Sequence, residues 1–212
     1  MNIHKSMESL SKRRPIFHLE SDLQFALAWE IQRDYPSSDV RLEVPFSHDK
    51  NGRIDIVVRQ NGSVFPIELK YLKKTLQHTI NDEIFALADG VHDMDMYGCM
   101  ADISRLESLC GQLPGFETGY AVWLTNDQAY WNKEYNASYY KAFHAPDGST
   151  KTGEMFYSLE NPKTKKPPQI LDIKKYQSSI TLKGSYKIKW NDYSDLGIPK
   201  GQFKYAVINI NR

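Results

Sequence analysis

The alternation of apolar and polar positions predicts the elements of the first half of the chain. Apolar residues recur at helical spacing over residues 21–34, after a Ser-Asp-Leu-Gln capping-box pattern at its start. Residues 40–46 alternate like a strand with one buried face. Further elements are expected in the order strand 53–59, strand 64–71, helix 94–109 and strand 119–125. Residues 72–90 carry no assignable pattern.

The second half is richer in aromatic residues and lysines. Strands are expected at residues 179–190 and 203–210, and a loop at 161–168, where Pro and Asn interrupt any regular element. Helices and strands mixed in this order indicate an α/β fold, a mixed sheet flanked by helices. We therefore predict a core domain at residues 15–130 and a basic, β-rich C-terminal extension at residues 131–212, packed on that core.

Charge is unevenly distributed along the chain. The formal net charge is only +1, but residues 1–140 hold 14 Lys or Arg against 20 Asp or Glu, whereas residues 141–212 hold 13 against 6. Lysines near the C-terminus alternate with aromatic residues, a combination that suits a phosphate backbone and unstacked bases. A solvated strand face is the alternative explanation.

Several classes of protein are disfavoured. The first 15 residues lack the apolar segment of a signal peptide, and no apolar run reaches the roughly 18 residues of a membrane span. Cys99 and Cys110 are too few for a disulfide framework. The histidines lack zinc-site spacing, and no phosphate-binding Gly-rich loop is present. A soluble, cytoplasmic protein without membrane association is expected.

The strongest local signal is Asn61-Gly62 between two β-rich runs, which favours a two-residue hairpin turn. Such a turn fixes the register, so that Asp55 is expected directly opposite Glu68. Opposed residues of an antiparallel pair have Cβ atoms only ~4.5–5.5 Å apart. Lys70 lies two residues beyond Glu68 and is therefore expected on the same face.

Two carboxylates side by side among apolar residues repel each other, and a divalent cation removes that cost. Mg²⁺ takes oxygen ligands, keeps several waters and polarises a phosphoryl oxygen. Lys70 can orient or deprotonate the attacking water, or neutralise negative charge on the pentacovalent phosphate. The alternative is an ordinary sheet face, with Asp55 paired to Arg53 or Arg59 and Glu68 paired to Lys70.

Asp55, then twelve residues, then Glu68-Leu69-Lys70 resembles the PD-(D/E)xK nuclease superfamily over roughly residues 19–125. The resemblance implies a restriction-endonuclease-like fold. It implies that Asp55, Glu68 and the backbone carbonyl of Leu69 bind Mg²⁺, which Mn²⁺ can replace, and that Lys70 serves the water. Ile54 stands where the motif has its proline.

Many members of that superfamily also carry a metal-linked glutamate on the first helix. Glu20 and Glu30 both fall on the apolar face of the predicted helix. Glu20 is the preferred candidate because the acid of resolvase-like members lies near the start of this helix. Alternatively, Glu20 is a first-turn glutamate that interacts favourably with the helix dipole. For Glu30, an ion pair with Arg33 is the preferred explanation.

Four residues are candidates for substrate binding: Gln77, Arg105, Lys174 and Lys175. The default explanation for Gln77 is an ordinary exposed polar residue. For Arg105, the preferred explanation is an ion pair with Asp102 on the same helix.

The sequence thus predicts a Mg²⁺-dependent nuclease that hydrolyses phosphodiester bonds of nucleic acid, DNA rather than RNA, with a homodimer as an open possibility. A catalytically silent nuclease-fold module that binds nucleic acid or protein is the alternative.

Overall fold

The computed structural model describes residues 1–45, 52–133, 138–157 and 179–211. Its helices are α1 (Ile3–Ser11), α2 (Glu20–Asp34), α3 (His92–Cys110), the short α4 (Gln128–Trp131) and a 3₁₀ turn (Ser138–Tyr140). Its strands are β1 (Asp39–Pro45), β2 (Arg53–Gln60), β3 (Ser63–Leu72), β4 (Leu76–Ile80), β5 (Glu83–Leu87), β6 (Thr118–Thr125), β7 (Thr150–Met155), β8 (Ile180–Lys187), β9 (Trp190–Asp195) and β10 (Gln202–Asn211).

Six strands form one mixed sheet in the order β1-β2-β3-β6-β10-β9. The β3–β6 pair is parallel, and the other neighbours are antiparallel. Helix α3 lies in the connection between the two parallel strands, as such a crossover requires. The β4–β5 and β7–β8 ribbons stand outside this sheet. The chain is therefore α/β with a mixed sheet, as predicted.

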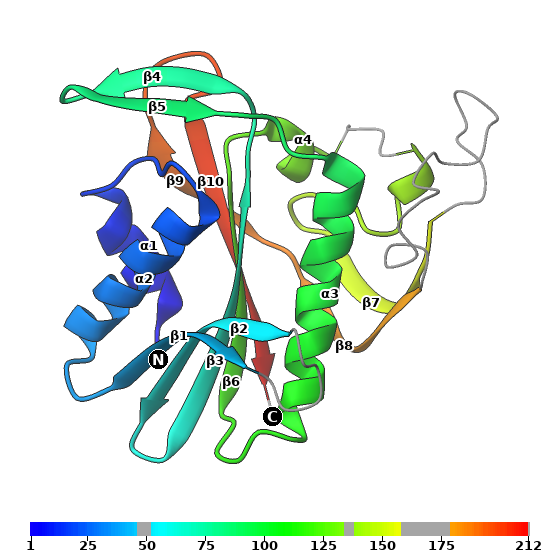
Figure 1. Cartoon of the computed structure of the whole chain (residues 1–212). Helices are drawn as coiled ribbons and strands as arrows, with labels where there is room; N and C mark the ends of the chain where they lie inside the picture. Colours follow the sequence, from blue (N-terminus) through cyan, green and yellow to red (C-terminus); the bar gives the residue numbers. More distant parts are fainter. Residues whose placement is uncertain (46–51, 134–137, 158–178, 212) are drawn as a thin grey trace.

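Helices cover both faces of the long central strands (Figure 1). Alternate residues of β6 show why. Ala121 and Trp123 pack into the apolar cluster that contains α3. Tyr120, Val122 and Leu124 pack into the cluster that contains α1 and α2. Because neighbouring side chains of a strand point to opposite faces, a strand buried on both sides reads as a continuous apolar run.

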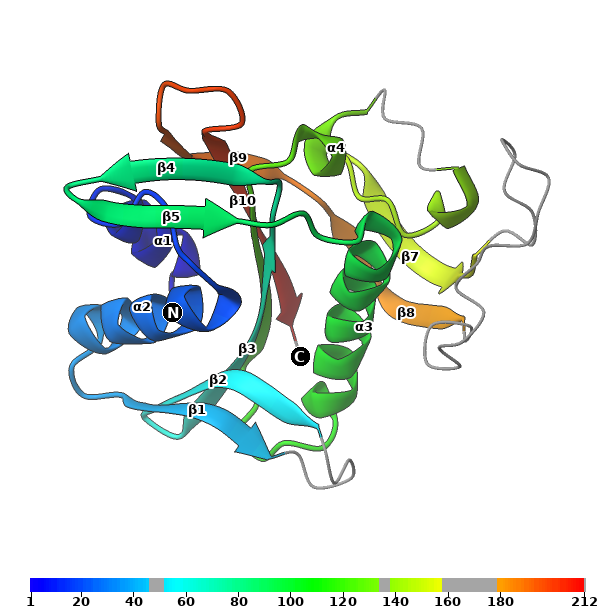
Figure 2. The same ribbon diagram turned by 45° about the horizontal axis from the view of Figure 1, so that its top comes forward.

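The β2–β3 hairpin has the predicted turn and register. Asn61 and Gly62 both have positive φ, +50° and +82°, as a type I′ turn requires. Gln60 pairs with Ser63, and the ladder continues to Ile56 opposite Ile67. Beyond that pair the two strands separate: β2 turns toward α3 while β3 continues along β6 (Figure 2).

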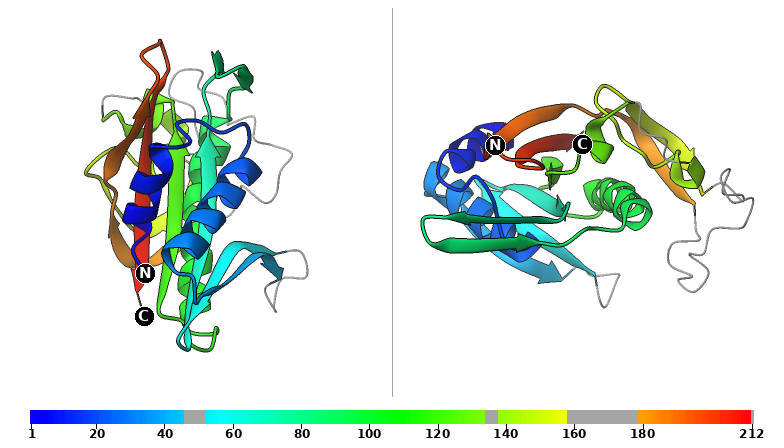
Figure 3. Two further views of the ribbon diagram at one scale, coloured as in Figure 1. Left: turned by 90° about the vertical axis from the view of Figure 1, so that its left-hand side faces the viewer. Right: turned by 90° about the horizontal axis from the view of Figure 1, so that it is seen from above.

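Several points of the sequence prediction need correction. The single strand expected at residues 179–190 is divided between β8 and the start of β9, which belong to different sheets. The N-terminal segment forms helix α1, which buries Ile3, Met7 and Leu10 and was not predicted because its apolar pattern is so short. The capping box is wrong, since α2 begins at Glu20 without a side-chain cap. Residues 72–90, left unassigned, contain the β4–β5 ribbon, which crosses one end of the molecule (Figure 3). The loop expected at residues 161–168 lies outside the described residues.

The C-terminal part of the chain completes the central sheet. Strand β10 pairs with β6 over eight residue pairs, from Lys204–Thr125 to Asn211–Thr118, and β9 pairs with β10. A boundary near residue 130 therefore divides the sequence but does not divide the sheet. No helix in the described ranges is long and apolar enough to span a bilayer.

Candidate functional site

The candidate site occupies the fork where β2 and β3 separate. The next ladder bond of β3 would be made by the backbone N–H of Leu69, which no longer faces a β2 carbonyl. Instead it donates to Oδ2 of Asp55 at 2.6 Å. The Asp55 side chain thus bridges the two strands just beyond the last ladder pair and lies beside Glu68 on β3.

Helix α2 closes the other side of the fork. Oε2 of Glu20 accepts from the backbone N–H of Tyr71 at 2.8 Å, so the two β3 donors freed by the departure of β2 both bind carboxylates. One turn later, the Gln24 amide donates to the backbone carbonyl of Asp55 at 2.7 Å and to Oε1 of Glu43 at 2.7 Å. Helix α2 therefore holds Asp55 by its main chain.

Helix α3 adds an acid and a cation above β3. Nε of Arg105 lies 3.0 Å from Oε1 of Glu68, and Arg105 also pairs with Asp102 one turn earlier on the helix. Oδ2 of Asp102 lies 2.9 Å from Nζ of Lys70. Glu68 and Asp102 are almost fully buried, with side chains 1% and 4% exposed. Acids and cations thus alternate from Glu68 to Lys70.

Lys70 is held as a cation. Its Nζ donates to the carbonyl oxygen of Leu69 at 2.9 Å and lies 4.0 Å from Oε1 of Glu20. Burial alone would lower the pKa of Lys70, but the carboxylates of Asp102, Glu20 and Asp55 outweigh it and hold the pKa above its ordinary value. Lys70 therefore offers a positive charge and not a free base.

The two central carboxylates resist ionisation. Burial raises the pKa of Asp55 to about 6, although the N–H of Leu69 and the charge of Lys70 oppose that shift. Burial and the neighbouring Asp102 carboxylate raise the pKa of Glu68 well above its ordinary value, against the attraction of Arg105. The positive charges of Lys70 and Arg105 therefore do not fully compensate the cost of burying these two carboxylates in ionised form.

The fork has oxygen donors that suit a metal ion, although they do not form a complete ligand set. Among the residues that the structure describes, no three His, Cys, Asp or Glu side chains gather as a metal-binding group. The fork does supply two carboxylates and the Leu69 carbonyl, all oxygen donors. Oε1 of Glu68 is buried and receives no hydrogen bond of normal geometry from any described residue. This donor chemistry suits Mg²⁺, which keeps several of its waters.

A cleft of about 350 Å³ opens beside the fork, along α3. Its walls include Lys70 from β3 and, from the helix and its N-cap, Val91, Met94, Gly98, Asp102 and Arg105. Solvent and a ligand can thus reach Lys70 and Arg105, whereas Glu68 lies beneath them.

The structure separates the candidate residues into two groups. Asp55, Glu68, Lys70 and Glu20 come together in the fork, and Arg105 joins them through Glu68. Gln77 lies exposed on the β4–β5 ribbon, with no described contact to this cluster. Lys174 and Lys175 lie outside the described residues.

The ordinary-surface alternative for the carboxylates does not hold in this structure. Arg53 donates to the carbonyl of Glu43, and Arg59 pairs with Asp39, so neither neutralises Asp55. Lys70 pairs with Asp102 and, at a longer distance, with Glu20, but not with Glu68.

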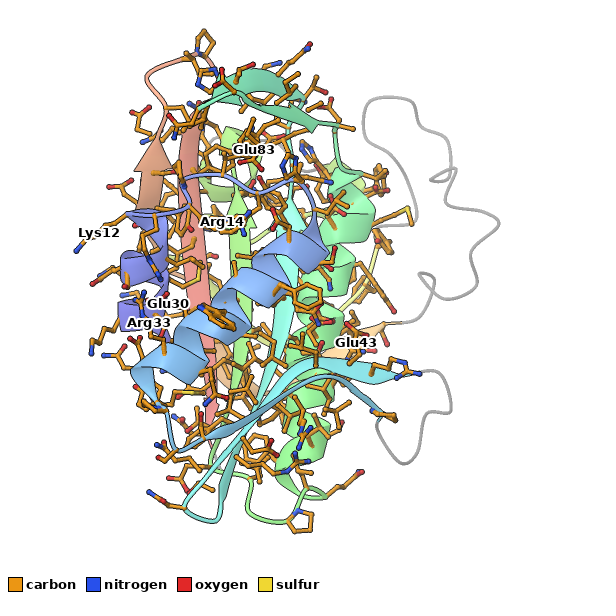
Figure 4. All side chains as sticks on the ribbon, turned by 60° about the vertical axis from the view of Figure 1, so that its left-hand side comes forward. Lys12, Arg14, Glu30, Arg33, Glu43 and Glu83 are labelled. Atoms are coloured by element: carbon orange, nitrogen blue, oxygen red, sulfur yellow. The ribbon has the colours of Figure 1, made fainter. Side chains whose placement is uncertain are left out.

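Glu30 forms the ion pair with Arg33 that was predicted. Its carboxylate is fully buried and pairs with Arg33 on α2, beside it in Figure 4, and with Arg13 after α1. The ion pair of Asp102 with Arg105 is also confirmed, although it is only part of what Arg105 does.

Asp102 and Gln24 are members of the site that sequence reasoning missed. The sequence suggests Asp102 only as a partner of Arg105, since nothing local reveals that α3 packs over β3. One signal was available: Asp102 falls on the same helix face as Ile103 and Leu106, where an acid needs a partner. Gln24 was assigned to a cap that does not form.

Comparisons with known proteins add no family assignment. No protein-family model matches the chain, no curated protein matches it, and no solved structure matches its fold.

Proposed function

We propose that this protein is a Mg²⁺-dependent nuclease of the PD-(D/E)xK type, acting on phosphodiester bonds of nucleic acid. The observation that carries the proposal is the fork in which Asp55 and Glu68 lie together, with Lys70 beside them, where β2 leaves β3. Buried carboxylates that resist ionisation, next to an open cleft, are typical of functional sites.

A restriction-endonuclease-like fold belongs to the same proposal. Helix α2, strands β1 to β3, helix α3 and strand β6 follow one another as the resemblance implies, and β3 and β6 are parallel. The β4–β5 ribbon and strands β9 and β10 are additions to that order.

Asp55, Glu68 and the carbonyl of Leu69 would hold the cation, with Glu20 as a further acid at the rim. When bound, Mg²⁺ would supply Lewis-acid polarisation of the phosphoryl oxygen and a metal-bound water. Glu68 would turn from Arg105 to the cation, and a substrate phosphate in the cleft would favour this exchange by taking up Arg105. Arg105 would then bind that phosphate through the N–H donors of its planar guanidinium group.

Lys70 would act as a fixed positive charge. Asp102 and the Leu69 carbonyl orient its ammonium, so little reorganisation is needed when negative charge develops on the phosphoryl oxygens. A preorganised charge of this kind stabilises the transition state more than the ground state. Positioning of Lys70 would thus be the main contribution of α3.

DNA is the proposed substrate, in the cytoplasm. Exposed Lys183 and Lys187 on β8 and Lys189 after it provide positive charge on the ribbon that packs against α3. Such charges bind phosphate backbones and make affinity decrease with salt. A homodimer stays a prediction.

The test is a cleavage assay on labelled DNA and RNA with purified protein in Mg²⁺, Mn²⁺ or EDTA. We expect cleavage of DNA in Mg²⁺ and Mn²⁺, and none in EDTA. Absence of cleavage of every nucleic acid in both metals would refute the enzymatic proposal. Asp55→Asn, which keeps size and shape, is the matched inactive variant.

One observation favours the second candidate, a catalytically silent binding module. Arg105 and Lys70 already pair with Glu68 and Asp102, so part of the negative charge is neutralised without a metal ion. For such a module, Mg²⁺ should neither bind nor raise the melting temperature. For the nuclease, Mg²⁺ should stabilise the parent by ligand linkage and leave Asp55→Asn unchanged.

A further inference from the structure

The cleft beside the fork is longer than hydrolysis of one phosphodiester bond requires. Val91, Met94, Gly98, Asp102 and Arg105 recur three or four residues apart, and so form one stripe along α3. At 1.5 Å per residue this stripe is about 21 Å long. The volume of the cleft, about 350 Å³, falls in the range of small-molecule binding sites, roughly 300–1,000 Å³.

Gly98 keeps the middle of this cleft open. Glycine weakens a helix interior relative to alanine, and Gly98 lies in the middle of the 19-residue helix α3. Packing does not demand it: a Cβ built there would meet only Cε of Lys70, at 3.5 Å, an ordinary contact. The missing side chain therefore leaves room next to Lys70, where a bound group would lie.

The two ends of the cleft differ in charge. Lys70, beside Gly98, and Arg105 supply two cations toward the end that meets the fork, and the Asp102 carboxylate pairs with both of them. At the other end lie apolar Val91 and Met94 together with Asp95, whose Oδ2 accepts from the Tyr130 hydroxyl at 2.7 Å. A carboxylate repels phosphate but accepts from the amino groups of bases.

This arrangement complements one nucleotide lying along the helix. We propose that the cleft binds the nucleotide next to the scissile phosphate, with its phosphate at Lys70 and Arg105 and its unstacked base beside Met94 and Asp95. The substrate class is therefore single-stranded nucleic acid. This inference rests on the proposed nuclease function and specifies its substrate.

Duplex substrates are disfavoured for a physical reason. A base reaches a cleft in the protein only after it leaves the stack, and this costs least in a strand that is already single. The duplex must also break its base pair to place the same nucleotide.

The test measures binding without metal, so that it does not depend on the proposed metal site. The probe is a fluorescently labelled single-stranded deoxyoligonucleotide in EDTA, compared by anisotropy with the same sequence as a duplex. We expect the single strand to bind at least about tenfold more tightly than the duplex, a difference of about 1.4 kcal/mol.

Gly98→Leu fills the cleft without changing any charge and should weaken single-strand binding by about tenfold. The matched control is Gly111→Leu, the same change at the exposed C-cap of the same helix, where nothing lies within 4 Å of the added Cβ. It should bind like the parent. Equal affinity for single strand and duplex, or parent-like binding by Gly98→Leu, would overturn the proposal.

If Gly98→Leu does not fold, Val91→Asp replaces it. Val91 is 55% exposed and is the N-cap of α3, where aspartate is favoured over valine, so this variant should fold at least as well as the parent. Its new charge at the mouth of the cleft should weaken single-strand binding about fivefold. Unchanged binding would count against the cleft.

Cleavage assays separate this inference from the proposed function. A parent that binds the single strand through the cleft and cleaves nothing in Mg²⁺ would refute the nuclease and retain the binding site. A parent that cleaves single strand and duplex at equal rates, with Gly98→Leu equally active on both, would refute the cleft and retain the nuclease.

Discussion

Two clusters of buried charge, one between α1 and α2 and one in the fork, differ in their balance of acids and cations. Between α1 and α2, one buried carboxylate, Glu30, is paired with Arg13 and Arg33, whose side chains are 43% and 45% exposed. In the fork, the carboxylates of Asp55, Glu68 and Asp102 outnumber the cations Lys70 and Arg105. The first cluster has more positive than negative charge, and the second has more acids than cations.

Their surroundings differ in the same sense. The arginines around Glu30 keep contact with water, so the pair links two helices at little cost in desolvation. The fork instead buries acids that disfavour their own ionisation and opens onto a cleft. A fold does not gain stability from such an excess, which is the imbalance that the proposed metal ion would offset. Glu30 and Glu20 start from similar positions in the sequence pattern, and only packing separates their roles.

The largest expected effect is on cleavage. Lys70→Ala should lower the rate by about 10²–10³, because it removes one preorganised charge, while metal binding is largely retained. Asp55→Ala should lose both metal binding and cleavage, because one carboxylate with a backbone oxygen holds Mg²⁺ poorly against its waters. Lys70→Arg should also be poor, since a planar guanidinium does not replace a point charge.

The measurements are single-turnover cleavage and calorimetric Mg²⁺ titration, with Glu30→Gln as the control from the balanced cluster. Glu30→Gln should cleave like the parent. Our assignment of Lys70 is wrong if Lys70→Ala cleaves as fast as the parent in saturating Mg²⁺.

The next effect is on stability, in the balanced cluster. The double substitution of Arg13→Ala and Arg33→Ala leaves the Glu30 carboxylate buried without a partner, which should cost about 3 kcal/mol in the free energy of unfolding. Glu30→Gln leaves only exposed arginines unpaired and should cost about 1 kcal/mol. Urea denaturation measures both. Equal costs would show that Glu30 is not held by these arginines.

The sequence could predict the part of the site that is local in the chain. The Asn61-Gly62 turn fixed the β2–β3 register through Ile56 and Ile67, and with it the proximity of Asp55 to Glu68. The exact opposition did not follow, because the strands separate after that pair and Asp55 binds the N–H of Leu69. The turn is local, whereas the separation depends on where α2 and α3 pack.

Long-range packing explains what remained hidden. Asp102 contacts Lys70 only because α3 crosses back over β3 on its way to β6. The insertion of β10 between β6 and β9 joins distant parts of the chain, and no periodicity within either segment reveals it. Helix α1 was missed because nine residues give too short a pattern to distinguish from a polar terminus.

A smaller effect, of opposite sign, sharpens the comparison. Glu68→Gln should stabilise the metal-free protein by about 1–2 kcal/mol, because it removes a buried acid whose pKa lies well above its ordinary value. Glu30→Gln should destabilise. Thermal melting in EDTA measures both, and Mg²⁺ should reverse the advantage of Glu68→Gln. If both variants destabilise equally in EDTA, the fork holds no excess of negative charge.

The smallest effect concerns Lys151, a third kind of buried charge. It lies on β7, 8% exposed, and its Nζ donates to the Ala142 carbonyl at 2.9 Å. Burial lowers the pKa of Lys151 to about 8, below its ordinary value of 10.5. No acid in the described part of the chain forms an ion pair with it, so it has neither a balancing charge nor the adjoining cleft of the fork.

The sign of its pH dependence follows from proton linkage. Between about pH 8 and pH 10 the unfolded chain keeps the Lys151 proton and the folded protein loses it, so the free energy of unfolding should rise with pH. Because the ammonium keeps one hydrogen bond, we expect a rise of about 1 kcal/mol. Denaturation of parent and Lys151→Met at both ends of this range isolates the effect, since the buried tyrosines contribute equally to both proteins. A parent-minus-variant difference that is constant with pH would show that Lys151 titrates as an ordinary surface lysine.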